Sequence, residues 1–157
     1  MRNNYSDKKD GPKGEQVENY RDKNMREYEE GLKKGYFRTV GGKRCMKPEM
    51  IVEYPKKMAF ILQDKNRNKL SQLWKFYSYV KQIQSHVKHG KAFELAEPDL
   101  CEICPKVNNA YNRGNVTRYF KDFIEDNVRM VKSAEDLDAF ARHFEAVIAY
   151  LPRKNQK

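Results

Sequence analysis

Positively charged and aromatic side chains gather in one stretch of this chain from which acidic residues are absent. Residues 65–91 contain seven Lys or Arg residues, two His and four aromatic residues but no Asp or Glu, although the whole chain has 22 acidic residues. A carboxylate close to a phosphate group weakens the binding of a polyanion, so a surface without carboxylates suits one. The stretch therefore predicts phosphate binding. Tyr79, which helical spacing directs toward the polar side, is the ring best placed to stack on a base.

Two histidines and two cysteines form a group whose residue types resemble a metal site. They are His86, His89, Cys101 and Cys104, and these side chains are ligands of tetrahedral zinc. Loose matches of this kind are usually accidental, and Cys104 falls on an apolar stripe, where a free cysteine acts as a small hydrophobic residue. We therefore expect no metal and no other cofactor. The alternative hypothesis is a zinc-stabilised helical adaptor that binds protein.

The sequence gives little support for an enzyme. A general acid or base needs carboxylates or histidines that converge in a pocket, and the acidic residues here fall on solvent-facing positions of the last two predicted helices. His143 lies beside a core stripe and is expected to pack. The basic loop 41–44 has no helix after it, so it is not a P-loop. We expect its Lys43 and Arg44 to touch phosphate as a flexible arm.

Charge is unevenly distributed along the chain, whose formal net charge is +10. Residues 1–47 carry 13 Lys or Arg and 8 Asp or Glu, residues 48–91 carry 9 and 3, and residues 115–151 carry 5 and 7. A basic front and a mildly acidic back predict nucleic acid and protein as partners. There is no apolar run long enough for a membrane span, and three cysteines are consistent with reduced thiols. We expect a cytoplasmic protein that binds no membrane.

Residues 1–47 differ in composition from the rest of the chain. They contain few large aliphatic residues and many polar and charged ones, which bury too little apolar surface to offset the entropy of ordering. The sequence therefore predicts a disordered or conditionally ordered basic tail over residues 1–47, within which 25–34 is compatible with a short helix on binding. The folded domain is predicted to span residues 48–157.

The apolar spacing beyond residue 55 is helical and shows almost no strand signal. It predicts an all-α fold, a compact bundle of about five helices over residues 55–63, 70–87, 99–112, 115–131 and 133–151. Ser133 and Asp136 resemble a capping box at the start of the last helix, and Pro152 ends it. Pro105 must begin or kink the third helix, which Gly114 ends.

Three segments of the predicted bundle resemble the small subunit of type III-A CRISPR effector complexes. They are residues 71–76 (SQLWKF), 103–113 (ICPKVNNAYNR) and 144–150 (FEAVIAY). The last is similar, almost letter for letter, to the family's F-F-E-A-[IL]-V-A-Y pattern. In the second, Pro105 and Lys106 fall on a Pro-Lys pair of the family and Arg113 falls on its arginine. In the first, Trp74 replaces an arginine. The resemblance covers about residues 58–151.

The resemblance implies a small, non-catalytic subunit that acts in antiviral defence. Several copies would pack along a filament of the guide-RNA-binding backbone subunit, in a complex with the large subunit, and line the channel that holds the guide RNA–target RNA duplex. Target cleavage would belong to the backbone subunit. The type III-B small subunit has the same role and is the nearest alternative. Together with the basic stretch, the resemblance gives the residues expected to contact RNA: Arg67, Lys69, Gln72, Lys75 and Arg113, with Lys43 and Arg44.

Overall fold

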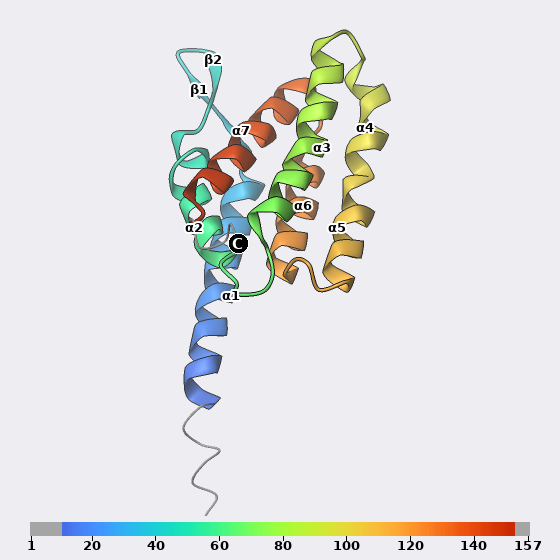
Figure 1. Ribbon diagram of the computed structural model, residues 1–157. Coiled ribbons are helices and arrows are strands. Elements are labelled where there is room, and N and C mark those ends of the chain that lie inside the picture. The colour runs from blue at the N-terminus through green and yellow to red at the C-terminus, as the bar shows by residue number, and fades with distance from the viewer. Residues whose placement is uncertain (1–10, 153–157) are drawn as a thin grey trace, which may run out of the picture.

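The computed structural model describes residues 11–152, and side chains from residue 20 onward. Over this range the chain is a bundle of α-helices with one small β-hairpin (Figure 1). The elements are α1 (Gly11–Lys33), β1 (Phe37–Val40), β2 (Lys43–Met46), the 3-10 helix η1 (Pro48–Met50), α2 (Glu53–Ile61), α3 (Leu70–Lys88), α4 (Phe93–Cys101), α5 (Ile103–Asn112), α6 (Arg118–Met130) and α7 (Ala134–Tyr150). The expected all-α bundle is confirmed.

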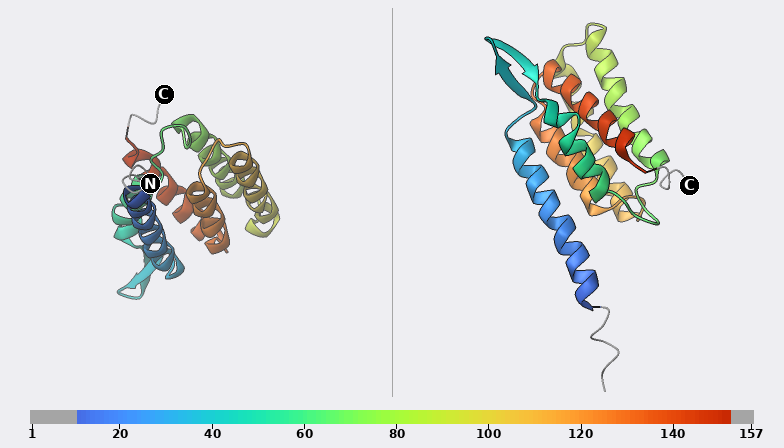
Figure 2. Two further views of the ribbon diagram at one scale, coloured as in Figure 1. Left: turned by 90° about the horizontal axis from the view of Figure 1, so that it is seen from below. Right: turned by 90° about the vertical axis from the view of Figure 1, so that its left-hand side faces the viewer.

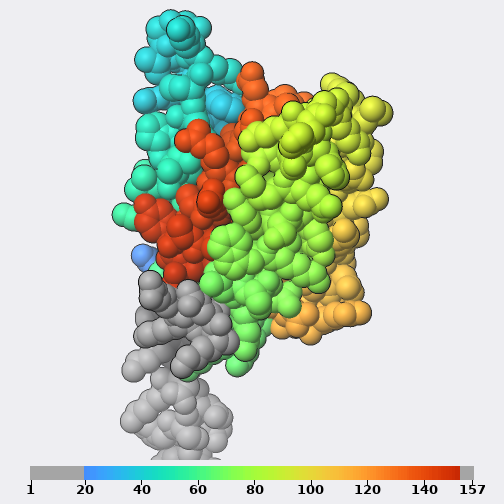
Figure 3. Space-filling model, turned by 45° about the horizontal axis from the view of Figure 1, so that its top comes forward, coloured from blue at the N-terminus to red at the C-terminus, as the bar shows by residue number. Residues whose placement is uncertain are grey.

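The helices pack around α6 and α7, which are the last two along the chain. Helix α7 lies between α2 and α3, whereas α6 lies between α1 and α5 (Figures 1 and 2). Helices α4 and α5 follow one another along the side of α3. In Figure 3, α3 forms a broad exposed surface next to α7. The acid-free stretch of the sequence is therefore carried mainly by an outer helix.

Aromatic rings of α6 and α7 fill the centre of the bundle. Phe123 and Phe144 meet edge to face, with their ring centroids 5.2 Å apart. Phe120 meets Phe76 of α3 in the same way at 5.5 Å. All four side chains are buried, and aromatic pairs in this geometry stabilise a core beyond the area that they bury. Phe144 therefore occupies the core position that the helical spacing of the last segment predicts.

Local signals set the ends of two helices as expected. The Ser133 hydroxyl oxygen accepts a hydrogen bond from the Asp136 backbone N–H at 3.1 Å, and the Asp136 carboxylate accepts one from the Lys132 N–H at 3.0 Å. These bonds satisfy backbone donors that an N-terminus leaves free. At the end of α5, Gly114 has a φ of 77°, a left-handed conformation that glycine adopts without strain.

The helix expected over residues 99–112 is two helices. Helix α4 begins at Phe93 and ends at Cys101, and α5 begins at Ile103. Pro105 lies in the first turn of α5, where its missing N–H leaves no helical hydrogen bond unmade. The two helices therefore form one bent column beside α3, and the expected kink lies at the start of α5.

A buried network of hydrogen bonds anchors the N-terminal segment in the core. Tyr36 donates from its hydroxyl to Asn127 Oδ1 at 2.6 Å, and Asn127 Nδ2 donates to the Tyr28 hydroxyl oxygen at 2.9 Å. The Tyr28 hydroxyl lies 2.8 Å from His143 Nε2, and His143 Nδ1 lies 2.6 Å from the Met50 carbonyl oxygen. Because a carbonyl only accepts, Nδ1 carries the proton and Nε2 accepts from Tyr28. His143 is thus a satisfied core residue.

This network corrects the expected boundary of the folded domain. The core includes Met25, Tyr28, Leu32 and Tyr36, so the folded unit begins well before residue 48. The composition argument failed because a tyrosine ring supplies a large apolar surface once its hydroxyl has a partner. Of the short helix expected over residues 25–34, residues 25–33 are part of the longer α1. Residues 1–10 of the expected tail lie outside the described residues.

A hairpin that the sequence did not predict projects from one end of the bundle (Figures 1 and 2). Its strands are antiparallel, with Phe37 opposite Met46 and Val40 opposite Lys43. Gly41 and Gly42 form the two-residue turn with φ values of 57° and 78°, as a tight hairpin turn with two left-handed residues requires. The pair of glycines that looked like part of a flexible loop is therefore the tip of a defined hairpin.

Candidate nucleic-acid interface

Two loops meet at the end of the bundle where α3 begins. Residues 62–69 connect α2 to α3, and residues 113–117 connect α5 to α6. Asn68 joins the loops because its Oδ1 accepts from the Thr117 backbone N–H at 2.9 Å and its Nδ2 donates to Thr117 Oγ1 at 2.8 Å. Thr117 also caps α6 by accepting from the Phe120 N–H. The cationic side chains of both loops are therefore held at a fixed spacing.

A groove between the first half of α3 and the end of α5 gathers cations and amides. Gln72 and Lys75 of α3 line it together with Lys106 and Arg113 from the side of α5. Its cavity is about 150 Å³, and none of the described residues that line it is Asp or Glu. We term it the α3–α5 groove. Its N–H groups can donate to phosphate oxygens, which Lys binds as a point charge and Arg as a fork.

Tyr79 also lines this groove, but its ring is already in contact with protein. The Lys106 ammonium lies 4.3 Å from the centroid of the Tyr79 ring, a cation–π distance. Phe76 packs edge to face against the same ring at 5.7 Å. The ring that the sequence singled out for base stacking is thus half-buried and packed, and it serves to position Lys106.

Carboxylates border the other half of α3. A cavity of about 260 Å³ at that end is lined by His86 together with Asp99 and Glu102. Lys91 forms an ion pair with Asp99 at 3.1 Å. Of these two cavities along α3, only the one toward its start therefore has no Asp or Glu among its described lining residues. This difference marks the α3–α5 groove as the phosphate-binding candidate.

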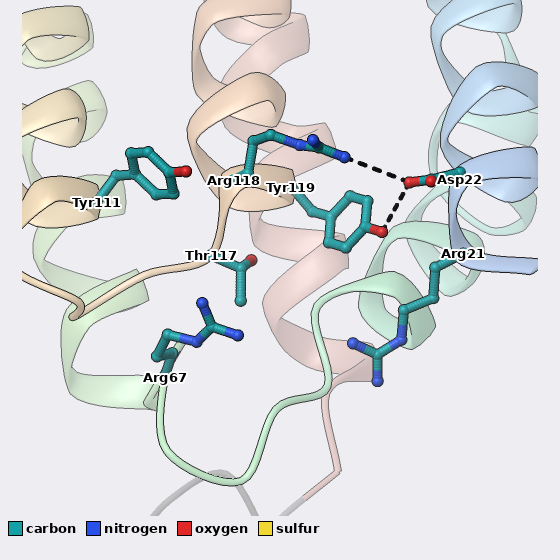
Figure 4. A pocket seen from close by; sticks show the side chains of 7 residues that line it. All are labelled: Arg21, Asp22, Arg67, Tyr111, Thr117, Arg118 and Tyr119. Carbon is teal, nitrogen blue, oxygen red and sulfur yellow. Dashed lines mark hydrogen bonds and ion pairs between the residues drawn. The ribbon is translucent and has the colours of Figure 1, made fainter. Parts of the chain in front are cut away.

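A larger cleft of about 460 Å³ opens beside the loop that connects α5 to α6 (Figure 4). We term it the arginine cleft; it is lined by Arg21, Asp22, Arg67, Tyr111, Thr117, Arg118 and Tyr119. These side chains come from α1, the loop before α3, the end of α5 and the start of α6. The cleft therefore depends on the packing of four separate segments.

Two carboxylates hold the side chains of the arginine cleft in place. Asp22 Oδ1 accepts from the Tyr119 hydroxyl at 2.7 Å and lies 3.4 Å from Arg118 Nη2. Burial and the hydrogen bond to Asp22 raise the pKa of Tyr119, so its hydroxyl remains a donor. Arg67 Nη2 lies 3.0 Å from Asp64 Oδ2. Burial favours a higher pKa for Asp64, but hydrogen bonds from Arg67 and from backbone N–H groups outweigh it and lower that pKa.

Most of the residues expected to contact RNA lie at this end of the bundle. Gln72, Lys75 and Arg113 come together in the α3–α5 groove. Arg67 lies in the arginine cleft instead. Lys69 is exposed at the N-cap of α3, directly after the buried Asn68. The structure thus places five predicted residues around two neighbouring loops.

Lys43 and Arg44 do not join this group. The hairpin that carries them lies at the opposite end of the bundle from the start of α3 (Figures 1 and 2). Arg44 lies 2.9 Å from Glu135 of α7, and its guanidinium stacks 4.3 Å from the Phe37 ring centroid. The expectation of a flexible arm is therefore wrong, because strand pairing and the contact with α7 fix the loop at the far end of the bundle.

Sequence reasoning missed several residues of the two cavities. Lys106 had a signal, because it falls on the Pro-Lys pair of the family motif. The others are Arg21, Tyr111, Arg118 and Tyr119, which no shared motif or spacing connects. They meet only because α1 packs against α6 and the two loops dock on one another.

The four residues of the zinc hypothesis do not form a metal site. Within residues that the structure describes, no three His, Cys, Asp or Glu side chains come together to hold a metal ion. Cys104 packs against the core, and burial raises the pKa of its thiol. His89 Nδ1 meets the Ser85 carbonyl oxygen at 2.7 Å, within its own helix.

Among the described helices, none is long and apolar enough to cross a bilayer.

The fold and these surfaces define a small helical-bundle protein with a cationic end formed by two docked loops. The family model described as Csm2 Type III-A matches residues 46–156. The chain belongs to this family; it is a small subunit of the type III-A CRISPR Csm complex and assembles with its other subunits. No curated protein and no solved structure matches the chain. Helix α1 and strand β1 precede the matched residues.

Proposed function

We propose that this subunit binds the guide RNA–target RNA duplex through the α3–α5 groove and contributes no catalytic residue. The observation that carries the proposal is the lining of the groove, where Lys75, Lys106 and Arg113 converge and none of the described lining residues is acidic. Cations that contact phosphate supply affinity without reading bases. A complex whose guide sequence varies needs binding of this kind. The subunit would act in this way in cytoplasmic antiviral defence.

The proposed place of the subunit in the assembly rests on its cationic end and on the acidic residues of its last two helices. The cationic end faces the duplex, whereas α6 and α7 carry seven of the chain's acidic residues and face protein. In this proposal several copies pack along the filament of the backbone subunit, near the large subunit. The neighbouring copies then present their grooves in a row along one duplex.

The chemistry of the groove supports a binding role. Lys75, Lys106, Arg113 and Gln72 all offer hydrogen-bond donors, and Lys and Arg are protonated at neutral pH. RNA cleavage by general acid–base catalysis needs a side chain that can accept a proton near neutral pH. His86 lines the other cavity, beside Asp99 and Glu102. In this proposal, target cleavage belongs to the backbone subunit.

The double variant Lys75→Ala/Arg113→Ala tests the proposal. Affinity for a short RNA duplex is measured by filter binding at several salt concentrations, with the full-length chain and with the assembled complex. Each phosphate contact contributes nearly one unit to the slope of log K against log salt, so the variant should flatten that slope by about two. Its melting temperature should stay that of the parent, because Arg113 and Lys75 are exposed.

A charge-matched control separates this surface from a general effect of net charge. Lys56 of α2 and Arg142 of α7 are also exposed, and they lie outside both cavities. The variant Lys56→Ala/Arg142→Ala removes the same charge and should leave the slope unchanged. Equal slopes for the two double variants would refute the groove as the RNA surface.

The remaining expected RNA contacts extend the proposal in two directions. Lys69 continues the groove surface along the loop before α3, and Arg67 of the same loop lines the neighbouring arginine cleft. Lys43 and Arg44 form a separate contact on the hairpin, at the far end of the bundle. Because the two surfaces are distant, Lys43→Ala/Arg44→Ala should weaken duplex binding by a factor that multiplies with that of the groove variant.

A further inference from the structure

The arginine cleft differs from the groove in ways that point to a different ligand. Its volume of about 460 Å³ falls in the range of sites that enclose a small molecule or a nucleotide. The α3–α5 groove, at about 150 Å³, has room for phosphate oxygens only. The cleft also combines three arginines with two tyrosine rings, whereas the groove presents mainly cations and amides.

We propose that the arginine cleft binds one unpaired nucleotide of an RNA strand, with its base against Tyr111 and Tyr119 and its phosphate on Arg67 and Arg118. The inference rests on the proposed function in that RNA is the ligand of this end of the molecule. It goes further in assigning a second binding site, distinct from the duplex groove and specific for a base that has left the helical stack.

The guanidinium groups of the cleft are fixed but not saturated. Arg67 contacts Asp64 through Nη2 at 3.0 Å, and Arg118 contacts Asp22 through Nη2 at 3.4 Å. A guanidinium has five N–H donors, so each of these ion pairs leaves donors for a phosphate. An ordered guanidinium loses less conformational entropy on binding than a free one. Asp22 and Asp64 therefore act as positioning residues for the two arginines.

The tyrosines supply ring surface from two sides of the cleft. In Figure 4, Tyr111 projects from α5 toward the space above Arg67, whereas Tyr119 projects from α6 toward Asp22 of α1. The Tyr119 hydroxyl donates to Asp22 at 2.7 Å, which fixes the orientation of that ring. Tyr111 keeps 36% of its surface exposed. Stacking of a base on an aromatic ring contributes about 1–3 kcal/mol and accepts any base.

The concave shape of the cleft selects an unpaired base. Bases within an A-form duplex are stacked, and its deep, narrow groove keeps side chains from their edges. A ring that lines a cleft can therefore meet only a base that is splayed out from the helix. The Asn68–Thr117 contact joins the loops that border both cavities, so the cleft and the groove are adjacent. The groove would hold the duplex phosphates beside the unpaired nucleotide in the cleft.

The test compares two RNA probes with the full-length chain. A labelled short oligouridylate reports single-strand binding, and a labelled short RNA duplex reports duplex binding, both by fluorescence anisotropy. The variant Tyr111→Leu should lower affinity for oligouridylate about tenfold, within the range expected for one stacked base, and leave duplex affinity unchanged. Arg118→Gln should weaken oligouridylate binding and flatten its salt slope by about 0.7.

Tyr150 provides a matched control on α7. Its exposure of 39% resembles the 36% of Tyr111, and it lies beside Lys56 rather than in the cleft. Tyr150→Leu should change neither affinity. The proposal is overturned if the parent does not bind oligouridylate, or if Tyr111→Leu either has no effect or lowers both affinities equally. The groove variant Lys75→Ala/Arg113→Ala addresses the duplex separately, so either assignment can fail alone.

Discussion

The side chain of Asn68 forms two hydrogen bonds with Thr117, a residue 49 positions further along the chain. Thr117 N–H donates to Asn68 Oδ1 at 2.9 Å, and Asn68 Nδ2 donates to Thr117 Oγ1 at 2.8 Å. Asn68 is buried and has a φ of 56°, in the left-handed region that asparagine tolerates better than most residues. Because Arg67 precedes Asn68 and Arg118 follows Thr117, this pair sets the distance between two cations of the cleft.

Two substitutions of Asn68 should separate the contribution of its hydrogen bonds to stability from the contribution of its backbone conformation. Asn68→Ala loses the bonds to Thr117 and to the Leu62 carbonyl oxygen. It keeps a Cβ in the left-handed region without the local hydrogen bonding that helps asparagine to adopt it, so we expect a loss of about 2–4 kcal/mol in the free energy of unfolding. Asn68→Gly loses the same bonds but also removes the Cβ, which relieves the left-handed backbone, so it should cost only about 1–3 kcal/mol. Urea denaturation measures both. Equal losses for the two variants would show that the φ of Asn68 carries no strain.

The Tyr28 hydroxyl should be needed for the N-terminal helix to stay docked. Tyr28→Phe removes the donor to His143 Nε2 and the acceptor for Asn127, which leaves buried polar atoms unpaired at a cost of about 1–3 kcal/mol. Tyr54→Phe is the control, because the Tyr54 ring packs against Tyr28 but its hydroxyl has no hydrogen-bond partner among the described residues. It should change stability by less than about 0.5 kcal/mol.

Local signals predicted the second half of the bundle well. Ser133 and Asp136 define the start of α7 through atoms a few residues apart, and the spacing around Phe144 reports one buried face. Such features depend on neighbours within two helical turns, so the sequence contains them directly. Lys75 and Arg113, which converge in the groove, could also be predicted as site residues, because both belong to segments that resemble the family motifs.

Features that depend on distant partners could not be predicted in this way. Tyr36 is buried because Asn127, 91 residues away, accepts from its hydroxyl. By composition alone, the segment around it is polar. Arg118 lines the cleft because α1 supplies Asp22, 96 residues away. Lys43 and Arg44 were expected in a flexible arm for the same reason, since only strand pairing and the packing of the hairpin against α7 fix their position.

Phe144 should carry much of the stability of the core. Its ring is fully buried and contacts Phe123 and Tyr77 at centroid distances of 5.2 and 5.6 Å. Phe144→Ala should therefore lower the free energy of unfolding by about 3–5 kcal/mol. Trp74→Ala, at a ring that is 43% exposed, should cost far less. A thermal melt near that of the parent for the Phe144 variant would mean that this ring lies at a surface between subunits.

His143 makes the stability of the fold depend on pH below neutrality. Burial lowers the pKa of His143 to about 4, although the hydrogen bond with the Met50 carbonyl opposes this effect. In the unfolded chain the pKa is about 6.5. Between these values the unfolded state binds the proton and the folded state does not. The contribution of His143 to the free energy of unfolding is therefore fully present above pH 6.5 and is lost as the pH falls toward 4. The loss from this residue alone is about 3 kcal/mol.

Comparison with a His143 variant separates the pH dependence due to His143 from that of the other titratable groups. Burial and the neighbouring Glu29 raise the pKa of Asp126 to about 6, and this carboxyl stabilises the fold as the pH falls, opposing His143. His143→Gln should be less stable than the parent at pH 7, and the difference should shrink as the pH approaches 4, because only the parent must pay for keeping a buried imidazole neutral. His86→Gln, at an exposed position, should have the stability of the parent at pH 7. Urea denaturation at intervals from pH 7 to 4 measures the three curves, and parallel curves for the parent and His143→Gln would mean that the folded chain protonates His143 as readily as the unfolded one.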